Sequence, residues 1–461
     1  MNADLRNPEM IEHDGEVVSN DFRRRLLETE PLCQRTMTPS LAVIHQSAGA
    51  YHFTPEGRQL ADFTSGVLVA NLGHQPRRWW RRVLSYLNLN HPDRDADYLR
   101  AVPFTAYNAV TGIEVEANRR LLANLRAQPG GGRMERVLWA ASGSEAVQKG
   151  LWAAMARRPG SDVILATRGG FHGKKGLAGA VTGCETDKER DPRVRFISFP
   201  VAECASFQRR REPIDLAPYQ RELAALKEEL GDRICALITE PYLGGGGSYH
   251  PQPEYLQMLQ AFCRENDIIF ILDEIQSNFG RTGPMYAFTH YGVEPDMVAL
   301  GKGMGNGVPV DAIVGRADLF ASLGYGEGSD TWSAHPFGCA AVLATLDEFE
   351  ESDVLKQGLA LSAVLEEELL KLTELPAVDA VRGEGTVWGV QFAAQGEKSA
   401  NEVAHAAVRA CYLGDEQGRA IHLLGPLAGK VVRVAPPLTM SVAEAREYLQ
   451  VMHGIIAGLG Q

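Results

Sequence analysis

A single lysine, Lys302, follows a short apolar run and is surrounded by glycines. The run, residues 298–300, is suited to a buried strand, and Gly301 and Gly303 allow close approach of the backbone. Burial lowers the proton affinity of a lysine amine and leaves it nucleophilic toward an aldehyde. The pattern predicts a lysine that holds an aldehyde as a Schiff base, and not an ordinary lysine on a polar helix face.

A second chemical signal lies upstream of Lys302, where Asp273 follows the apolar run 268–272. The ordered segments LDEIQSNFGRTG (272–283), EPD (294–296) and GKG (301–303) closely resemble the signature of class III aminotransferases of the ornithine and 4-aminobutyrate type. Those enzymes use pyridoxal 5'-phosphate (PLP) and have the fold called type I. The resemblance implies an α/β fold, with a mostly parallel central sheet covered by helices in a large domain and a smaller α+β domain.

The composition narrows the class of partner. The chain has 461 residues, which suits a large domain plus a smaller one, and its formal net charge is −12. No basic tract is long enough for a nucleic-acid footprint, no stretch approaches a membrane span, and no signal-peptide core can be drawn near the N-terminus. The seven cysteines are scattered without Cys-x-x-Cys pairs, which is typical of reduced thiols. We therefore expect a cytoplasmic protein whose partners are small molecules.

The middle of the chain alternates short apolar or β-branched runs with helical patterns, as a parallel sheet covered by helices requires. Leucines at helical spacing predict a helix that stops at Gly231, and Pro253 opens another that ends near Asn266. The expected strands are Arg136–Ala140, 162–166, Ile234–Thr239 and 268–272. This order predicts a βαβ series.

The two ends of the chain have a different character. After Trp332 a long helical stretch, 337–371, is followed by β-like Val387–Phe392 and Val431–Val434, and residues 51–53 and 60–63 resemble a hairpin near the N-terminus. The resemblance implies that the N-terminal segment packs with the C-terminal domain. We expect an N-terminal segment (1–75), a large PLP-binding domain (76–335) and a small domain (336–461), with soft boundaries.

A phosphate site is predicted at residues 142–144, in a turn between a strand and a helix. Ser142 and Glu145 have the spacing of a capping box, and a helix N-terminus offers unpaired N–H groups and a positive dipole end to an anion. A plain capped helix is the alternative. The family resembled places Ser/Thr-Gly-Ser/Thr/Val-Glu-Ala here, and the sequence SGSEA matches it. The resemblance thus implies that Ser142, Gly143 and Ser144 hold the PLP phosphate.

Thr331 looks like the family threonine that reaches the phosphate of the neighbouring subunit. The resemblance therefore implies a homodimer with sites at the subunit interface. The usual continuation of that motif is Asn-Pro, and here it is His335-Pro336.

The residues around the cofactor ring also follow from the resemblance. A carboxylate against the pyridine nitrogen keeps that nitrogen protonated and strengthens PLP as an electron sink. Asp273 matches this carboxylate, and Gln276 matches the residue that hydrogen-bonds the phenolic oxygen. Phe171-His172-Gly173 matches the aromatic-x-Gly element whose ring stacks on PLP, although a phenylalanine alone is more often core packing.

Four positions are candidates for binding substrate. Arg433 matches the arginine that clamps a substrate carboxylate with its bidentate fork, the alternative being an arginine that ends a surface strand. Glu240 resembles the glutamate that pairs with this arginine when no carboxylate is bound. Val67 stands where ornithine aminotransferases carry a tyrosine. Lys174 stands where many relatives carry arginine for a distal carboxylate, and it permits such a handle without demonstrating one.

The predicted activity is transamination from an amine or ω-amino acid to a keto acid such as 2-oxoglutarate or pyruvate, through Lys302 as Schiff base and proton carrier. The same scaffold also serves lyases and decarboxylases that release ammonia, phosphate or CO2, and the fold does not choose between them. A regulator without activity would normally carry an added DNA-binding module or lack the lysine. A nucleotide site in the glycines after Leu300 has the wrong spacing.

Overall fold

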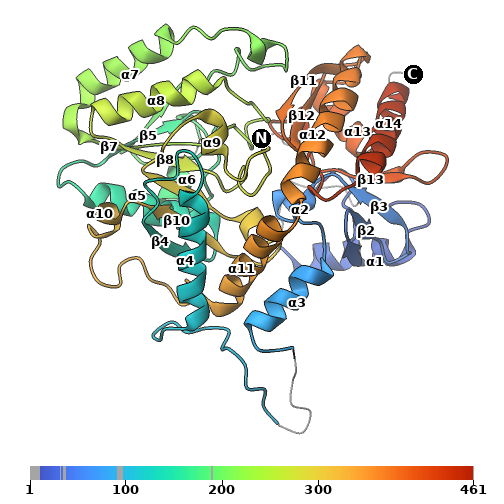
Figure 1. Ribbon diagram of the computed structural model, residues 1–461. Helices are drawn as coiled ribbons and strands as arrows, with labels where there is room; N and C mark the ends of the chain where they lie inside the picture. The colour runs from blue at the N-terminus through green and yellow to red at the C-terminus, as the bar shows by residue number, and fades with distance from the viewer. Residues whose placement is uncertain (1–10, 32, 35–37, 91–96, 188–189, 460–461) are drawn as a thin grey trace.

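The computed structural model describes residues 11–31, 33–34, 38–90, 97–187 and 190–459. Its largest sheet has seven strands in the order β4-β10-β9-β8-β7-β5-β6, and β10 runs against the other six. The strands are β4 (Arg136–Ala140), β5 (Val163–Thr167), β6 (Val194–Ile197), β7 (Ile234–Thr239), β8 (Ile269–Asp273), β9 (Met297–Leu300) and β10 (Asp311–Gly315). The predicted α/β class with a mostly parallel sheet is confirmed (Figure 1).

The central strands are buried on both faces because successive side chains enter two different cores. In β8, Phe270 and Leu272 join the larger core, whereas Ile269 and Ile271 join the other. Helices α4, α7, α8 and α11 complete the larger core, and α5, α6 and α10 complete the other. Their bounds are α4 (Gly112–Arg126), α5 (Gly143–Ala156), α6 (Gly176–Ala180), α7 (Ala217–Leu230), α8 (Pro253–Glu265), α10 (Ala317–Phe320) and α11 (Pro336–Glu351).

Helix boundaries show where local sequence signals suffice and where they do not. Helix α7 ends at Gly231, which has φ 56°, and α8 begins at Pro253 and is followed by Asn266, as predicted. The expected single helix 337–371 is instead two, α11 and α12 (Val354–Lys371), because Ser352 between them is extended. No glycine or proline marks that break, and the only local signal is Ser352-Asp353, two residues of the type that precedes a helix. Strands β6 and β10 were also not predicted.

The C-terminal part contains a three-stranded antiparallel sheet, β11-β12-β14. Helices α12, α13 and α14 contribute Leu361, Val408 and Leu449 to the core that this sheet shares. The elements are β11 (Val378–Glu384), β12 (Val387–Phe392), α13 (Ala400–Leu413), β14 (Val431–Val434) and α14 (Val442–Gly458). This arrangement agrees with the expected smaller α+β unit.

The N-terminal strands join the far end of the chain in one sheet. Strands β1 (Gln46–Ala48), β2 (Tyr51–Phe53) and β3 (Gln59–Asp62) are antiparallel neighbours, and β13 (Ala420–His422) pairs with β3 in parallel. Helix α1 (Val17–Thr29) is tied to the same region, since Arg23 and Glu16 both contact Tyr412 of α13. The domain limits near 75 and 335 stay predictions.

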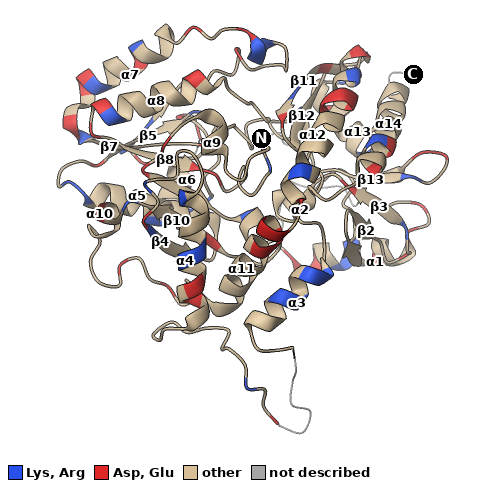
Figure 2. Cartoon of the chain, in the orientation of Figure 1, with Lys and Arg blue, Asp and Glu red and all other residues tan. Residues whose placement is uncertain are grey.

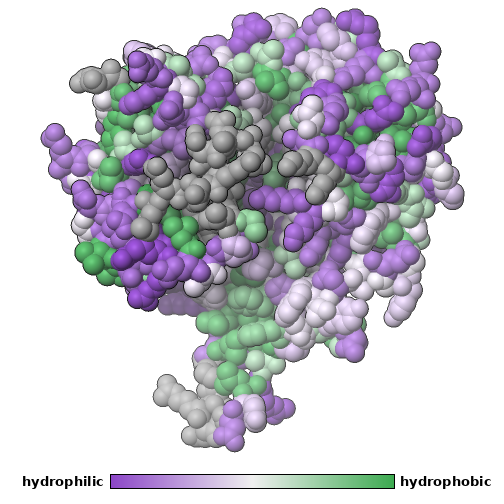
Figure 3. Space-filling model, turned by 180° about the vertical axis from the view of Figure 1, so that it is seen from behind, coloured by the Kyte–Doolittle hydropathy of each residue, from purple (hydrophilic) through white to green (hydrophobic). Residues whose placement is uncertain are grey.

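Charged helices flank the segment that projects from the molecule. Helix α3 (Arg77–Tyr86) presents Arg78 and Arg82 to Glu348 and Glu351 of α11, and Figure 2 shows these blue and red faces opposed. Residues 97–111, which lead into α4, extend from the body and expose apolar side chains (Figure 3).

The remaining short elements are α2 (Ser65–Leu68), α9 (Ala287–Tyr291) and the 3-10 turns Arg209–Arg211, Gly231–Arg233, Lys302–Met304 and Leu372–Glu374. Within the described ranges, no helix combines the length and apolar character that crossing a membrane would require.

Candidate active site

A cavity of about 410 Å³ lies where several parallel strands of the large sheet end. Strands β4, β5, β8 and β9 run in the same direction, so the residues that follow them meet at one edge, where open α/β sheets bind ligands. Eight predicted site residues line this cavity: Ser142, Gly143, Ser144, Phe171, His172, Asp273, Gln276 and Lys302. The structure therefore brings these eight residues together, and their roles stay predictions.

Lys302 is partly buried and follows β9 after one residue, Gly301. Its backbone is left-handed, with φ 47°, a conformation that is uncommon outside glycine and often occurs at active sites. Burial lowers the pKa of its amine, against the opposing fields of Asp273 and Asp311. No described residue forms a hydrogen bond or ion pair with this amine. A desolvated lysine that opens into a cavity without a partner is suited to nucleophilic attack.

Asp273 is held in place by two contacts. Its Oδ1 accepts a hydrogen bond from the N–H of Ile275 (3.0 Å), and its Oδ2 lies 2.8 Å from Nδ1 of His172. His172 is buried, and its Nε2 has no partner among the described residues. The histidine orients a carboxylate that faces the cavity, a role that the sequence reading did not assign to it.

The turn before α5 has the predicted cap with one difference. Ser142 Oγ accepts from the N–H of Glu145 (3.3 Å), but the Glu145 carboxylate accepts from the N–H of Ala141 (2.9 Å) and not from Ser142. A side chain at Gly143 would lie 2.7 Å from Ile275 Cδ1. Gly143 and Ser144, at the start of α5, both line the cavity, and a helix N-terminus is suited to binding an anion.

Glu240 joins three parts of the site. Its Oε2 accepts from the N–H of Phe171 (2.9 Å), and its Oε1 accepts from Gln276 Nε2 (3.2 Å) and from the N–H of Gly244 (3.3 Å). Burial raises the pKa of Glu240 to about 7, and His172 acts in the opposite direction. Glu240 therefore fixes the position of the aromatic platform and of the glutamine.

The expected direct pairing of Arg433 with Glu240 is wrong for this structure. Although both side chains are in the described part of the chain, they form no ion pair; Arg433 Nη2 donates to the carbonyl of Gly244 (2.8 Å), and the N–H of Gly244 reaches Glu240. Arg433 is buried, burial lowers its pKa, and its Nε has no hydrogen-bond partner among the described residues. A backbone amide separates the two charges, and the guanidinium keeps free donors.

Val67 lies in a strained loop, α2. Its φ is 68°, Ser65 and Leu68 are also left-handed, and Val67 itself is exposed. Ser65 Oγ donates to the carbonyl of Ala435 (2.7 Å), and Leu68 packs with Ala435 and Tyr242. Val67 does not line the cavity that contains Lys302, but its loop is fixed beside the strand that carries Arg433.

The support for this loop was missed in the sequence. Asp62 Oδ1 accepts from both the N–H and the hydroxyl of Thr64 (2.7 Å each), and its Oδ2 lies 2.7 Å from His74 Nε2 and 3.4 Å from His52 Nε2. Thr64 in turn accepts from the N–H of Gly66 (3.0 Å). Burial would raise the pKa of Asp62, but the hydrogen bonds from the two histidines hold it well below its usual range. Histidines 52 and 74 are far from any motif, which explains the omission.

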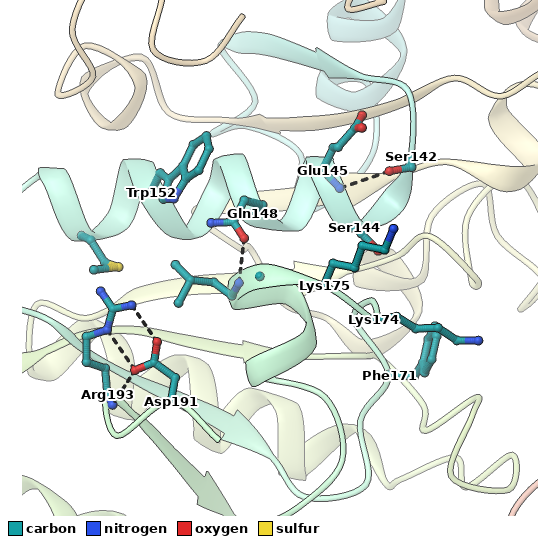
Figure 4. Close-up of a pocket in the computed structure, with 13 residues that line it drawn as sticks. Ser142, Ser144, Glu145, Gln148, Trp152, Phe171, Lys174, Lys175, Asp191 and Arg193 are labelled. Carbon is teal, nitrogen blue, oxygen red and sulfur yellow. Dashed lines mark hydrogen bonds and ion pairs between the residues drawn. The ribbon is translucent and has the colours of Figure 1, made fainter. Parts of the chain in front are cut away.

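Lys174 lines a second, more open cavity of about 950 Å³ that shares Ser142, Ser144 and Phe171 with the first. Figure 4 shows Lys174 beside Phe171, and Lys175 beside Ser144. Lys174 is exposed and lines only this outer cavity, whereas Lys302 lines only the inner one. Thr331 is exposed and lines neither cavity.

Two further carboxyl groups at the site were not predicted. Glu274 is buried and accepts from the N–H groups of Ala287 (2.7 Å) and Phe288 (2.6 Å), so it anchors the turn after β8. Asp311 lines the inner cavity at the start of β10. The sequence signal for Asp311 is its position next to the apolar run 312–314, and the same kind of signal identified Asp273.

Comparisons with known proteins agree on one family. A family model described as aminotransferase class-III matches residues 32–456. The chain is 28% identical to an acetylornithine aminotransferase of Methanothermobacter thermautotrophicus, covering 92% of this chain and 96% of that protein, and 29% identical to a 2-aminoadipate transaminase of Pseudomonas putida, covering 92% and 99%. A PLP-bound amine transaminase from an uncultivated Pseudomonas species shares the fold, with a TM-score of 0.75, 24% identity and coverage of 98% and 100%.

Proposed function

Because the chain belongs to the class III aminotransferases, which are PLP-dependent transaminases, we propose that it moves an amino group from an amine or ω-amino acid to a keto acid, with Lys302 as the residue that bonds the cofactor. The observation that carries this proposal is the unpartnered, desolvated Lys302 in the cavity that Asp273 also lines. The lyase and decarboxylase alternative finds no support in the relatives.

The residues present fit the cofactor. A negatively charged phosphate matches the N–H groups at the start of α5, where Gly143 and Ser144 line the cavity. Gly143 and Gly173 allow the close packing of this turn, because a Cβ at either would collide with Ile275 or Ser144. Asp273 supplies the charge that a pyridinium needs. PLP, when bound, draws electrons from the bond that breaks at the substrate carbon.

The chain's own groups then divide the remaining work. Lys302 would bond the aldehyde of PLP when the cofactor is present, and its amine, with its pKa lowered by burial, would accept and return the proton at the substrate carbon once the substrate amine has replaced it. His172 keeps Asp273 oriented. Phe171 is held by its N–H bond to Glu240 and supplies a flat apolar wall.

A carboxylate on the substrate has a matching partner in Arg433. Its Nε is buried without a hydrogen-bond partner among the described residues, and a buried unpaired donor is unfavourable until a ligand satisfies it. Glu240 sits one backbone amide away and lowers the net positive charge when no acid is bound. Lys174, at the entrance, can meet a distal acidic group and favours donors with a second acid or a keto acid such as 2-oxoglutarate.

We further propose a homodimer in which Thr331 serves the partner's site. Thr331 is exposed, and its neighbour Trp332 is 55% exposed. Apolar side chains on the projecting segment are exposed as well (Figure 3): Tyr98, Leu99, Phe104, Tyr107 and Val110. Exposed apolar surface of this kind commonly marks an interface, and Tyr107 contacts Ser329 in the Thr331 loop (3.5 Å). The unpaired state of all seven cysteines supports a cytoplasmic location.

The test is the absorbance spectrum of the PLP-loaded protein. For transamination, we expect an amino donor to remove the long-wavelength absorbance band and 2-oxoglutarate or pyruvate to restore it. Ammonia or phosphate release without a keto acid would instead indicate a lyase.

The role of Arg433 has a separate test. Arg433→Gln should raise the KM for ω-amino acids about a hundred-fold and change the KM for a simple diamine by no more than about two-fold, since only the acid uses the guanidinium. Lys174→Gln removes the cation that is proposed to meet a distal acidic group. Lys175→Gln is its matched control, because both lysines line the outer cavity.

A further inference from the structure

Asp311 is a carboxyl group inside the cofactor cavity that has no partner. The residue is 7% exposed and lines the cavity together with Lys302 and Ser144. Within the part of the chain that the structure describes, no residue forms a hydrogen bond or ion pair with its carboxyl oxygens. Buried carboxyl groups are normally paired, so this one requires an explanation.

The position of Asp311 relates it to the phosphate cradle and to the lysine at once. It pairs across the sheet with Ala140, which immediately precedes the turn before α5. Its Oδ1 lies 3.6 Å from the place where a side chain at Gly143 would begin, and it also lies against Gly301, where a Cβ would collide with it. The carboxyl group therefore sits between the start of α5 and the residue before Lys302.

The charged groups that face Asp311 come from three neighbouring elements. Burial raises the pKa of Asp311 to about 7; Lys302, after β9, lowers it, and Asp273 of β8 and Glu145 of α5 raise it. From the start of α11, His335 reaches the carbonyl of Pro309 (3.1 Å). A phosphate dianion at the start of α5 would add a further negative charge and favour the protonated carboxyl still more.

We propose that Asp311 is a further positioning residue of the cofactor site, which accommodates the cofactor phosphate as a neutral carboxylic acid and repels it once ionised. This inference rests on the proposed use of PLP. Two anions in one enclosed cavity repel strongly because the surrounding medium screens them poorly. The retention of the phosphate ligand is therefore expected to fall as the pH rises through the titration of Asp311.

The direction of the pH dependence follows from the charge on Asp311, which is present only when its carboxyl group is ionised. Below its pKa, Asp311 is neutral and the N–H groups of Gly143 and Ser144 act on the phosphate unopposed. Above it, the ionised carboxyl subtracts from their positive potential. Asp311→Asn keeps the shape of the side chain and removes the ionisation, so this variant should lose the part of the pH dependence that comes from Asp311.

The experiment measures binding without turnover. Pyridoxamine 5'-phosphate carries the phosphate but cannot form a covalent bond with Lys302. Its dissociation constant for the cofactor-free protein therefore measures the non-covalent binding alone. We expect wild type and Asp311→Asn to agree within about two-fold near pH 5.5 and Asp311→Asn to bind about ten-fold or more tightly near pH 9. Ionisation of the free ligand is common to both proteins and cancels in the ratio.

Glu145→Gln is the matched control, because it removes a carboxylate that also faces Asp311 but is exposed. Its affinity ratio to wild type should stay nearly constant with pH. Asp311→Ser supplies a second neutral side chain in case the asparagine disturbs packing. A ratio of Asp311→Asn to wild type that is flat with pH overturns the inference while leaving the proposed function intact. Failure of wild type to bind the ligand at any pH overturns both.

Discussion

Two enclosed aspartates, Asp62 behind the α2 loop and Asp311 in the cofactor cavity, experience opposite environments. Asp62 receives hydrogen bonds from Thr64 and His74 and faces His52, and its pKa lies well below the usual range. Asp311 has no hydrogen-bond or ion-pair partner among the residues that the structure describes, and burial raises its pKa to about 7. Burial alone therefore does not set the charge of a carboxyl group; its partners do.

The same contrast recurs in two lysines. Lys149 is buried in α5 and donates to the carbonyl of Trp139 (2.7 Å), to Asp330 (2.7 Å) and to Ser333 (2.8 Å). Lys302 has none of these contacts. Satisfied groups hold the fold together, whereas groups left unsatisfied at the cavity are available to a ligand.

The largest expected effect tests the lysines. Lys302→Met should reduce kcat/KM for transamination about a thousand-fold or more while leaving the free energy of unfolding within about 0.5 kcal/mol of wild type, because no contact is lost. Lys149→Met should instead lower the free energy of unfolding by about 2–3 kcal/mol, because it strands buried acceptors. Steady-state kinetics and urea denaturation give both quantities. Equal destabilisation by the two changes would remove the contrast.

The second prediction concerns Asp62. Asp62→Ala should lower the free energy of unfolding at neutral pH by about 3–5 kcal/mol, because buried donors lose their acceptor. Since the folded pKa is depressed, this contribution is present above the unfolded pKa of about 4 and is lost as the pH falls through and below it. Urea denaturation at several pH values measures the gap between variant and wild type. A gap that widens in acid would contradict the prediction.

Much of the site could be predicted because its chemistry is tied to contiguous sequence. Lys302, Asp273 and the turn at 142–144 each follow a strand of the parallel sheet, so a local pattern was enough to bring them to one edge. Asp311 was not predicted as a site residue because it begins β10, the antiparallel strand of the large sheet, whose pairing with β4 joins residues far apart in sequence. The indirect link from Arg433 to Glu240 through Gly244 depends on loop geometry that no residue pattern encodes.

The third prediction applies the comparison to stability at Asp311. Its folded pKa of about 7 exceeds the unfolded value of about 4, so wild type loses stability as the pH rises between these values and the loss is constant above 7. Asp311→Asn should escape this loss and become more stable than wild type by up to about 4 kcal/mol near pH 8, with little difference near pH 4. Denaturation of the cofactor-free protein at both pH values decides it, and a less stable variant at pH 8 would show that Asp311 has a partner after all.

The smallest effect is expected in the loop that Asp62 supports. Val67→Gly should raise the free energy of unfolding by about 0.5–1 kcal/mol, because the left-handed backbone at φ 68° is strained for valine and the side chain is exposed. Val69→Gly, where φ is −99°, should lower it. Thermal unfolding of the two variants side by side tests whether the strain is real.

The sheet that pairs β3 with β13 has a consequence for how the protein is made. Residues 46–62 are synthesised long before Ala420–His422, the strand that completes their sheet. The hydrogen bonds that join Glu16 and Arg58 to Tyr412 also depend on a segment that is synthesised much later. Because pairing between distant segments is slow, we expect strands β1 to β3 to reach their final structure late in folding.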